Sequence, residues 1–485
     1  MLENTGVKIT PVNFSASSTS VGPNAGEPLF QPELLKRFDI NGPRYTSYPT
    51  ADRFHGEFSQ QDYIGALKRT AKTGKPISLY YHLPFCPNIC YYCGCNKIIT
   101  KDHGRSAKYI KYLAKEMKMV TDVMGCSDKK IPVTQLHWGG GTPTFLSHEE
   151  MRELMHHTRE HFDLQEGGEY SIEIDPRRVS EADISLLAEL GFNRISLGVQ
   201  DFNLEVQQAV HRVQSIEETK AVIDWARKHG FNSVSVDLIY GLPKQTPETF
   251  KETVDAVIAM DPDRLSVYSY AHLPTIFKPQ RRIAEEDLPV AKDKLSILAN
   301  TIDQLNQAGF VFIGMDHFSK PDNELAIAQK EGRLHRNFQG YSTQAECDLL
   351  AFGISSIGKV DDTYPQNLKT LDEYYHAIDR HELPTMRGLQ LDKDDILRRE
   401  LIGELMCQFE LDTDKFSNDH KINFDTYFAN ELPELKELEE AGLLEWHGRK
   451  IYVPIKGRLL VRRVAMAFDR HLRDAKTHAK YSKVV

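Results

Sequence analysis

The chain has 485 residues, enough for one large domain or for two to three ordinary ones, and its 69 acidic and 60 basic residues give a net charge of −9. A net acidic chain is not typical of a nucleic-acid-binding protein, and no run of about 20 uncharged apolar residues predicts a membrane span. The N-terminus lacks the basic and apolar segments of a secretory signal, so we expect a cytoplasmic protein with a flexible tail over residues 1–30.

Strand-like and helix-like segments alternate through the middle of the chain, after an N-terminal segment (31–75) that we expect to pack on the domain that follows. The predicted strands lie at 77–83, 133–138, 169–174, 193–200, 232–240 and 263–270. Capping boxes mark the starts of two intervening helices, with Ser147 paired to Glu150 and Ser215 paired to Glu218.

The dipeptide Gly-Phe follows three of the predicted helices, at Gly191, Gly230 and Gly309. Glycine ends a helix readily because it accepts a positive φ, and the phenylalanine can pack as the next strand begins. This alternation predicts parallel strands joined by right-handed helical crossovers. Six to seven units, with no G-x-G-x-x-G after the first strand, favour an α/β fold with a partial (β/α)6-type barrel over residues 76–385.

The last hundred residues have a different pattern. "KDDILRRELIGELMCQFELD" (393–412) predicts a helix, and residues 432–472 predict a helix, a short hairpin and another helix. We therefore expect a mostly helical, winged-helix-like C-terminal domain over 386–485. The acidic run "ELPELKELEE" (431–440) argues against DNA binding and favours a lid or packing role.

Polar or flexible residues stand at the C-terminal end of every predicted strand, where active sites of parallel barrels collect. In strand order they are the cysteines of "CPNICYYCGC" (86–95), "GGGTP" (139–143), Glu173 with Asp175, Gln200, Asp237, and Ala271 with His272.

The cysteine stretch contains four of the seven cysteines, in the pattern C-x3-C-x2-C-x-C. Clustered thiols in a chain without a signal peptide favour metal binding over disulfides. Structural zinc sites usually pair two C-x2-C units, and no second unit exists. One loop suits a four-iron cluster held by three thiolates, which leaves one iron open to a ligand. Cys95 is then either a bystander or a fourth ligand.

This loop, with an aromatic residue (Tyr92) before its third cysteine, resembles the radical S-adenosylmethionine (SAM) superfamily, and so does the glycine-rich stretch after the second strand. Residues 38–485 further resemble the oxygen-independent coproporphyrinogen III oxidase family. The segments that carry this resemblance are "GPRYTSYPTA" (42–51), "CGCNK" (93–97), "LHWGGGTPT" (136–144), "GVQDFN" (198–203), "DLIYGLPKQT" (237–246), "YAHLPTIF" (270–277) and "HRNFQGY" (335–341).

The resemblance implies an oxidoreductase of haem biosynthesis, which converts two propionates of coproporphyrinogen III to vinyl groups, giving protoporphyrinogen IX without O2. It also implies a [4Fe–4S] cluster with three cysteine ligands and two SAM molecules, one of which yields a 5′-deoxyadenosyl radical at the reduced cluster. The alternatives are a haem-binding chaperone of the same fold, an anaerobic radical SAM enzyme that opens haem, and, more remotely, a zinc-binding interaction protein.

The family's functional residues map onto this sequence by its motifs. The resemblance assigns the cluster to Cys86, Cys90 and Cys93, and the cluster-bound SAM to Tyr80, Tyr92, Gly140 and Glu173. It assigns the second SAM to Gly141, Thr142, Gln200, Arg212, Asp237, Ala271 and Ile357. Cys95 is predicted to be catalytic, because the "CGC" pairing resembles the oxidase more than the chaperone.

The predicted partners are coproporphyrinogen III, an electron donor of the flavodoxin or ferredoxin type and an unidentified electron acceptor, and we expect a monomer. A substrate with four carboxylates requires local cations, and the candidates are Arg44, Lys97, Arg281, Arg282 and Arg336. Arg44, in an irregular segment with aromatic neighbours, is the preferred substrate-contacting or gating residue.

Overall fold

The computed structural model describes residues 28–126, 130–343, 347–473, 481 and 483. The predicted flexible tail therefore lies outside the described residues up to position 27. At its predicted end, Leu29 and Phe30 are buried in the main hydrophobic cluster. Burying two large apolar side chains is favourable, so the prediction of a tail over 1–30 was wrong for these residues.

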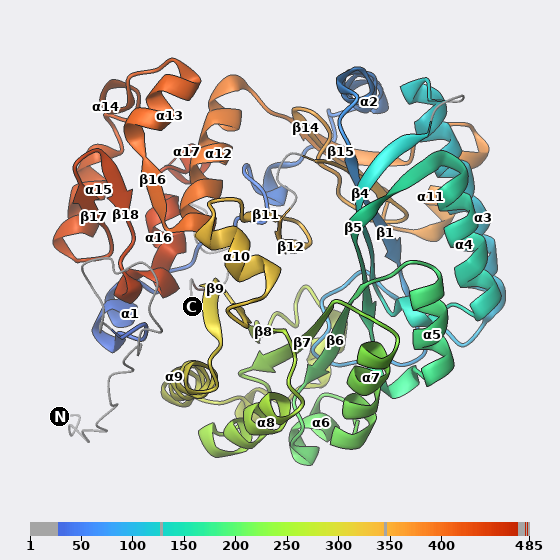
Figure 1. Ribbon diagram of the computed structural model, residues 1–485, viewed down its shortest axis with the longest axis horizontal. Coiled ribbons are helices and arrows are strands. Elements are labelled where there is room, and N and C mark those ends of the chain that lie inside the picture. The colour runs from blue at the N-terminus through green and yellow to red at the C-terminus, as the bar shows by residue number, and fades with distance from the viewer. Residues whose placement is uncertain (1–27, 127–129, 344–346, 474–480, 482, 484–485) are drawn as a thin grey trace.

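A nine-stranded sheet forms the centre of the molecule (Figure 1). In spatial order its strands are β13 (Asp348–Phe352), β1 (Ile77–Leu83), β4 (Ile131–Gly140), β5 (Phe162–Ile174), β6 (Arg194–Gln200), β7 (Ser233–Tyr240), β8 (Arg264–Ser269), β10 (His317–Ser319) and β9 (Val311–Gly314). Neighbours from β13 to β8 pair in parallel, whereas β10 is antiparallel to both β8 and β9. The predicted α/β fold with a partial barrel is confirmed.

Six longer helices alternate with the strands and cover the outer face of the curved sheet (Figure 1). They are α3 (His103–Met124), α4 (His148–His161), α5 (Glu181–Glu189), α7 (Ile216–Lys228), α8 (Pro247–Ala259) and α9 (Ala291–Gln307). The capping boxes predicted at Ser147 and Ser215 are both present. Gly191, Gly230 and Gly309 each have a positive φ after their helices, as expected.

Two strands of this sheet were not predicted from the sequence. β13 pairs in parallel with β1, so β1 has neighbours on both sides. β10 separates β8 from β9, so β9, which follows the Gly-Phe dipeptide at Gly309, lies at the edge of the sheet and not beside β8. Both strands are short, with five and three residues, and their pairing depends on long-range contacts that no local pattern reveals.

The middle strands alternate between fully buried and partly exposed positions, which is unusual for a parallel sheet. In β6, Ile195, Leu197 and Val199 are buried, whereas the polar Ser196 between them is partly exposed. β7 repeats this pattern. The apolar positions belong to the main hydrophobic cluster, which includes residues of the outer helices, so the polar positions line the inside of the curved sheet.

The C-terminal region is mostly helical and lies to one side of the sheet (Figure 1). Its helices are α12 (Lys393–Gln408), α13 (Thr413–His420), α14 (Phe424–Tyr427), α15 (Leu432–Glu440), α16 (Val461–Met466) and α17 (Arg470–Arg473). A small antiparallel sheet of β16 (Glu410–Asp412), β18 (Lys450–Tyr452) and β17 (Glu445–His447) completes the winged-helix-like arrangement. One hydrophobic cluster contains residues of this region, the central sheet and the N-terminal segment, so the domain boundaries at 76 and 386 stay predictions.

The N-terminal segment joins the sheet to the C-terminal helices. It contains α1 (Pro32–Phe38) and α2 (Gln60–Thr73). Between these helices, the Pro43 carbonyl accepts a hydrogen bond from Arg462 (2.7 Å), and the Tyr45 hydroxyl donates one to Asp469 (2.9 Å). The stretch around residues 42–48 is therefore held against the C-terminal helices.

The remaining elements are short helices and two-stranded sheets in the connections. They are α6 (Leu204–Ala209), α10 (Glu324–Lys330), α11 (Leu371–Asp379), β2 (Phe85–Cys86) with β3 (Ile98–Ile99), β11 (His335–Asn337) with β12 (Gly340–Ser342), and β14 (Thr363–Asn367) with β15 (Thr385–Gln390). Across the described ranges, every helix is too short or too polar to traverse a lipid bilayer.

Glu116 is a buried carboxylate in the middle of α3. It accepts hydrogen bonds from the Gly353 N–H (2.9 Å), the Asn367 amide (2.6 Å) and the Tyr374 hydroxyl (2.6 Å). These donors come from the loop after β13, from β14 and from α11, so a single side chain ties three connections to α3. Burial raises the pKa of Glu116 to about 7 even with these donors.

This pKa predicts a specific pH dependence of stability. A raised pKa means that the folded state holds a proton that the unfolded state has released, so stability falls as the pH rises from about 4.5 to about 7. Relative to Glu116→Gln, the wild-type protein should lose about 3 kcal/mol of unfolding free energy across that window. Chemical unfolding of both proteins at the two pH values measures this loss, and parallel pH dependences would contradict the assignment.

Candidate active site

The cysteine loop starts where β1 ends and is anchored at several points. Cys86 ends β2, and the hydrogen bond from the Ile98 N–H to the Pro84 carbonyl (2.7 Å) closes the base of the loop. Further along, the Tyr91 N–H donates to the Val210 carbonyl (2.9 Å), and the Gln280 amide donates to the Tyr92 carbonyl (2.9 Å). Backbone contacts with the connections after β6 and β8 thus position the loop.

The four thiols of this loop have different surroundings. Arg212 and Arg177 donate weak hydrogen bonds to the Cys90 sulfur (3.6 and 3.8 Å). Burial raises the pKa of Cys86 to about 11, whereas a hydrogen bond with Cys95 lowers the pKa of Cys93 to about 6. Cys95 is the exposed member of the four.

In the described ranges, no three His, Cys, Asp or Glu side chains converge tightly enough to share one metal ion. In an iron–sulfur cluster each thiolate binds a different iron, so its thiols do not need to meet at one point. Cys86, Cys90 and Cys93 lie on one anchored loop, and their thiols are suitable ligands for such a cluster.

The glycine stretch after β4 packs closely against the start of the cysteine loop. The Gly141 N–H donates to the Leu83 carbonyl (2.8 Å), and the Thr142 N–H donates to the Phe85 carbonyl (2.9 Å). A Cβ atom on Gly141 would lie 2.6 Å from a backbone atom of Pro84, and one on Gly140 would lie 2.6 Å from the His82 ring. Only glycine allows this approach, and it leaves the backbone of the stretch beside the cysteines.

Glu173, near the end of β5, has its carboxylate oriented by two neighbours. One oxygen accepts from the Gly140 N–H (3.0 Å), and the other lies 3.4 Å from the ring nitrogen of His137. Burial acts to raise the pKa of Glu173, but these contacts outweigh it and hold the pKa below its usual value. Tyr80 stacks on His137 at 5.9 Å, so residues of three adjacent strands meet here.

Arg212 and Asp175 form an ion pair on the other side of the cysteine loop. Asp175 lies 3.3 Å from Arg212 and 2.6 Å from Arg177, and both arginines also contact the Cys90 sulfur. Burial acts to raise the pKa of Asp175, but the two cations hold it below its usual value. Arg212 further donates to the Gly198 carbonyl, and Gln200 lies beside them with a positive φ of 70°.

Asp237, in β7, is more isolated and lies on the inside of the curved sheet. Its carboxylate accepts a hydrogen bond from the Ser196 hydroxyl of β6 (2.9 Å). Burial raises its pKa to about 6, and hydrogen bonds from serine hydroxyls, with a smaller contribution from the charge of His137, oppose this rise only in part. The carboxyl can therefore be protonated near neutral pH and can both donate and accept hydrogen bonds.

The remaining predicted residues lie in three different surroundings. Ala271 is partly exposed after β8. Ile357 follows β13 and belongs to a separate small cluster with Phe54 and Tyr364. Arg44 forms an ion pair with Asp316, at the turn between β9 and β10.

Three residues that shape this site were not among the predicted ones. His82 and His137 alternate with apolar residues in β1 and β4, and Arg177 follows the predicted Asp175 by two positions. The two histidines contact Tyr80, Glu173 or the glycine stretch. A polar residue at every second position of a parallel strand is a usable signal, because such strands are normally apolar on both faces.

Two family models match the chain. The model of the radical SAM superfamily matches residues 80–257, which contain the cysteine loop and the strands from β4 to β7, and the model of the HemN C-terminal domain matches residues 391–460.

Curated proteins match almost the whole chain. It is 49% identical over 455 residues to an oxygen-independent coproporphyrinogen III oxidase of Pseudomonas aeruginosa, and 46% identical over 452 residues to one of Escherichia coli. Each alignment covers 93% of this chain and 98% of the relative. The solved structure of coproporphyrinogen III oxidase from Escherichia coli, described as a radical SAM enzyme, superposes with a TM-score of 0.85 at 46% identity, covering 89% of this chain and 100% of that one.

The close approach at Gly141 predicts a large effect of a single methyl group. Gly141→Ala places Cβ against the backbone of Pro84 and Phe85, which cannot rotate away, and should lower the unfolding free energy by about 1–3 kcal/mol. Gly65→Ala in α2 is the matched control, since its nearest neighbour is the flexible Arg69 side chain at 3.3 Å. Chemical unfolding should show a gain for the control; equal stability of the Gly141 variant and wild type would refute the constraint.

Proposed function

This chain belongs to the oxygen-independent coproporphyrinogen III oxidase family of radical SAM enzymes, and we propose that it converts two propionates of coproporphyrinogen III into vinyl groups with loss of two CO2. The observation that carries this proposal is the full-length identity of up to 49% to relatives with that name, combined with a cysteine loop, a glycine stretch and carboxylates at one edge of the sheet. The [4Fe–4S] cluster and SAM of this superfamily supply a radical that removes a hydrogen atom from the propionate.

Cys86, Cys90 and Cys93 are the proposed ligands of the cluster. Their loop is anchored by hydrogen bonds of its backbone, which fix the positions from which the three cysteine side chains project. Arg177 and Arg212, which contact the Cys90 sulfur, place positive charge beside the cluster, and such hydrogen bonds and charges tune cluster potentials.

The cluster-bound SAM is proposed to contact Tyr80, Tyr92, Gly140 and Glu173. Glu173 is already oriented by His137 and the Gly140 N–H, which leaves carboxylate lone pairs to accept hydrogen bonds from an ammonium group or a ribose. The close-packed glycines bring backbone N–H and C=O groups to the same place.

A second SAM is proposed to contact Gly141, Thr142, Gln200, Arg212, Asp237, Ala271 and Ile357. Arg212 supplies a cation for a carboxylate, and Asp237 supplies a carboxyl that exchanges a proton near neutral pH. Ile357 packs in a small hydrophobic cluster apart from the other residues. Its position relative to them depends on the loop after β13, where the Gly353 N–H donates a hydrogen bond to Glu116.

Cys95 and Arg44 are the proposed catalytic residues. The Cys95 thiol hydrogen-bonds with Cys93 and is exposed, which places a proton donor beside a cluster ligand. Arg44 is proposed to contact the substrate, and Asp316 is its partner in the structure. A substrate carboxylate would compete with Asp316 for this guanidinium.

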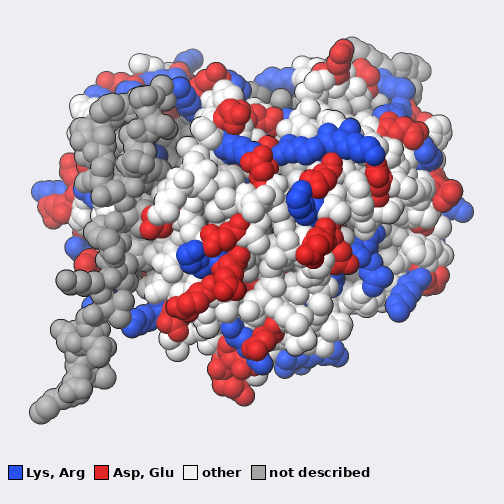
Figure 2. Space-filling view, turned by 60° about the horizontal axis from the view of Figure 1, so that its bottom comes forward, with Lys and Arg blue, Asp and Glu red and all other residues white. Residues whose placement is uncertain are grey.

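The proposed partners are an electron donor of the flavodoxin or ferredoxin type and a separate electron acceptor, with the protein acting as a monomer. On the face shown in Figure 2, acidic and basic side chains are interspersed and form no broad basic surface of the kind that binds nucleic acid. Relatives that carry the oxidase name favour this reaction over the haem-chaperone and haem-opening alternatives.

The reaction itself is the direct test. The anaerobically reconstituted protein, supplied with a chemical reductant, SAM and coproporphyrinogen III, should form protoporphyrinogen IX, detected by mass spectrometry as the loss of two CO2. Tight haem binding without any decarboxylated product would instead support the chaperone alternative and overturn the proposal.

The two adjacent cysteines should respond differently to the same substitution. Cys93→Ser should lose the cluster, seen as loss of bound iron and of the absorption near 400 nm, because serine is a poor ligand for iron–sulfur clusters. Cys95→Ser should retain iron and SAM binding but lose decarboxylation activity. If Cys95→Ser also loses its iron, the ligand assignment is wrong.

A further inference from the structure

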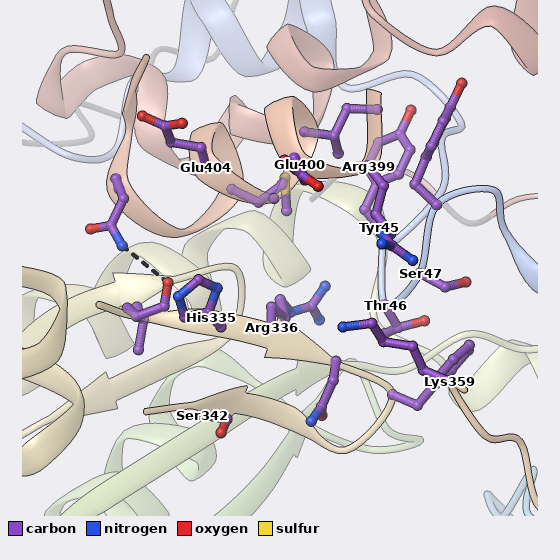
Figure 3. Close-up of a pocket in the computed structure, with 18 of the residues that line it drawn as sticks. Tyr45, Thr46, Ser47, His335, Arg336, Ser342, Lys359, Arg399, Glu400 and Glu404 are labelled. Atoms are coloured by element: carbon purple, nitrogen blue, oxygen red, sulfur yellow. Dashed lines mark hydrogen bonds between the residues drawn. The ribbon is translucent and has the colours of Figure 1, made fainter. Parts of the chain in front are cut away.

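A large cavity lies between the N-terminal segment, the β11–β12 hairpin and α12 (Figure 3). Its volume is about 800 Å³. Gln135 of β4 and Ser342 of β12 form its floor, joined by a hydrogen bond of 2.6 Å, and Gln135 also accepts from Ser78 of β1 (3.1 Å). The cavity therefore opens onto the inside of the curved sheet, at strands that also carry the candidate active site.

Three cationic side chains point into one part of this cavity. Figure 3 shows the nitrogen-bearing ends of Arg336, Lys359 and Arg399 directed toward the same space beside Thr46 and Ser47. They come from β11, from the turn before β14 and from α12, so the fold and not the sequence brings them together.

The two arginines lack carboxylate partners among the described residues. Arg336 donates to the Arg44 carbonyl, and Arg399 hydrogen-bonds with the Tyr364 hydroxyl, but no ion pair joins either of them to Asp or Glu in the described ranges. Moreover, Nε of Arg336 and Nη1 of Arg399 are buried without a hydrogen-bond partner. Buried guanidinium N–H groups of this kind are normally satisfied, so both arginines have donors left to bind a ligand.

Arg336 is also repelled by two further buried arginines, Arg44 and Arg462, which lie outside the cavity lining. Burial lowers the pKa of Arg462 to about 9, and the charges of Arg44 and Arg336 contribute to this decrease. Burial, together with the charges of Arg336 and Arg44, also lowers the pKa of His317 to about 3. An anion bound at the cationic end of the cavity would offset this repulsion.

A chain of ring contacts connects this cationic end to the candidate active site. Arg336 lies over the ring of Tyr341 (5.4 Å), whose edge contacts His317 (5.1 Å), and His317 contacts Tyr268 (5.9 Å). Burial is the main cause that raises the pKa of the Tyr268 phenol, and the charge of the Asp237 carboxylate raises it further. Asp237 therefore lies near this ring. A large ligand could thus occupy the cavity while part of it reaches the inner face of the sheet.

We propose that Arg336 and Arg399, with Lys359 beside them, bind the carboxylates of the tetrapyrrole substrate that do not react, and so hold the reacting side chain toward the active site. The inference rests on the proposed function for the identity of the ligand. The aromatic walls at Tyr45 and Phe338 suit a macrocycle whose charges are all at its edge. Of the five cations predicted from the sequence, only Arg336 lines this cavity.

The test compares a free acid with its ester. Coproporphyrin III, the fluorescent oxidised form of the substrate, and its tetramethyl ester are titrated against reconstituted wild-type protein, Arg336→Gln, Arg399→Gln and the double variant. Each substitution should weaken binding of the acid at least about tenfold, because a charge-assisted hydrogen bond is lost, and should hardly change binding of the ester. Arg152→Gln, an exposed arginine of α4 that pairs with Glu189, is the matched control and should change neither.

Further measurements separate this role from a structural one. Iron content and cleavage of SAM without substrate should match wild type in each variant, whereas the KM for coproporphyrinogen III should rise by the same factor as the acid's Kd. If a variant does not fold, binding of both probes to the wild-type protein is measured at increasing salt concentration instead. Only binding of the acid should then weaken. An unchanged acid-to-ester ratio in the variants, or equal salt dependence of both probes, overturns the inference. Absence of product from wild type would instead overturn the proposed function.

Discussion

The parallel pairing of β1 with β4 is the constraint on which the site depends. Their register places Leu83 opposite Gly140, so the cysteine loop and the glycine stretch leave the sheet side by side. The glycines then pack against the backbone at Pro84 and Phe85, where no side chain fits. Because β5 to β8 continue the sheet in parallel, the carboxylates of Glu173 and Asp237 reach the same edge without any contact between distant loops.

The same strands also explain why four acidic side chains behave differently. Glu173 and Asp175 are held below their usual pKa by neighbouring donors and cations, whereas burial raises the pKa of Asp237 and of Glu116. The difference follows from what the sheet and its connections supply: an arginine pair at Asp175, but mainly serine hydroxyls at Asp237. One type of side chain therefore provides a fixed charge in one place and a proton in another.

Much of the fold and part of the candidate site could be predicted from the sequence, because both depend on local patterns. Strand ends and helix caps such as Ser147 with Glu150 are encoded within a few residues, and the parallel alternation then brings the strand-end residues together. Glu116 was not predicted as a buried group, although it lies three residues after Leu113 and four before Val120, within the apolar stripe of its helix. A carboxylate at such a position indicates buried hydrogen-bond donors, but the sequence cannot say which connections supply them.

The remaining site residues could not be predicted, because their positions depend on long-range contacts. Arg399 belongs to a helix without any motif, and Lys359 precedes a strand that was not predicted, so neither could be assigned before their elements were placed around one cavity. Of the predicted cations, Lys97 instead donates to backbone carbonyls of the cysteine loop, Arg281 donates to the Pro274 carbonyl, and Arg282 lies over the ring of Tyr91. Residue type alone does not distinguish an arginine that supports a loop from one that is positioned to bind a ligand.

The arrangement of charge in the cavity also resolves an apparent conflict between a net charge of −9 and an anionic ligand. Charges act over roughly 8–10 Å in physiological salt, so binding depends on the local arrangement and not on the sum over the chain. Glu404 lies on the side of the cavity opposite the three cations (Figure 3), and burial, with the nearby Asp412 and Glu410, raises its pKa. Glu400, Lys330 and Lys415 also line the cavity, so acidic and basic side chains are mixed over the rest of its lining. A net acidic chain can therefore hold the carboxylates of an acidic substrate at the part of the cavity where Arg336, Lys359 and Arg399 point toward the same space.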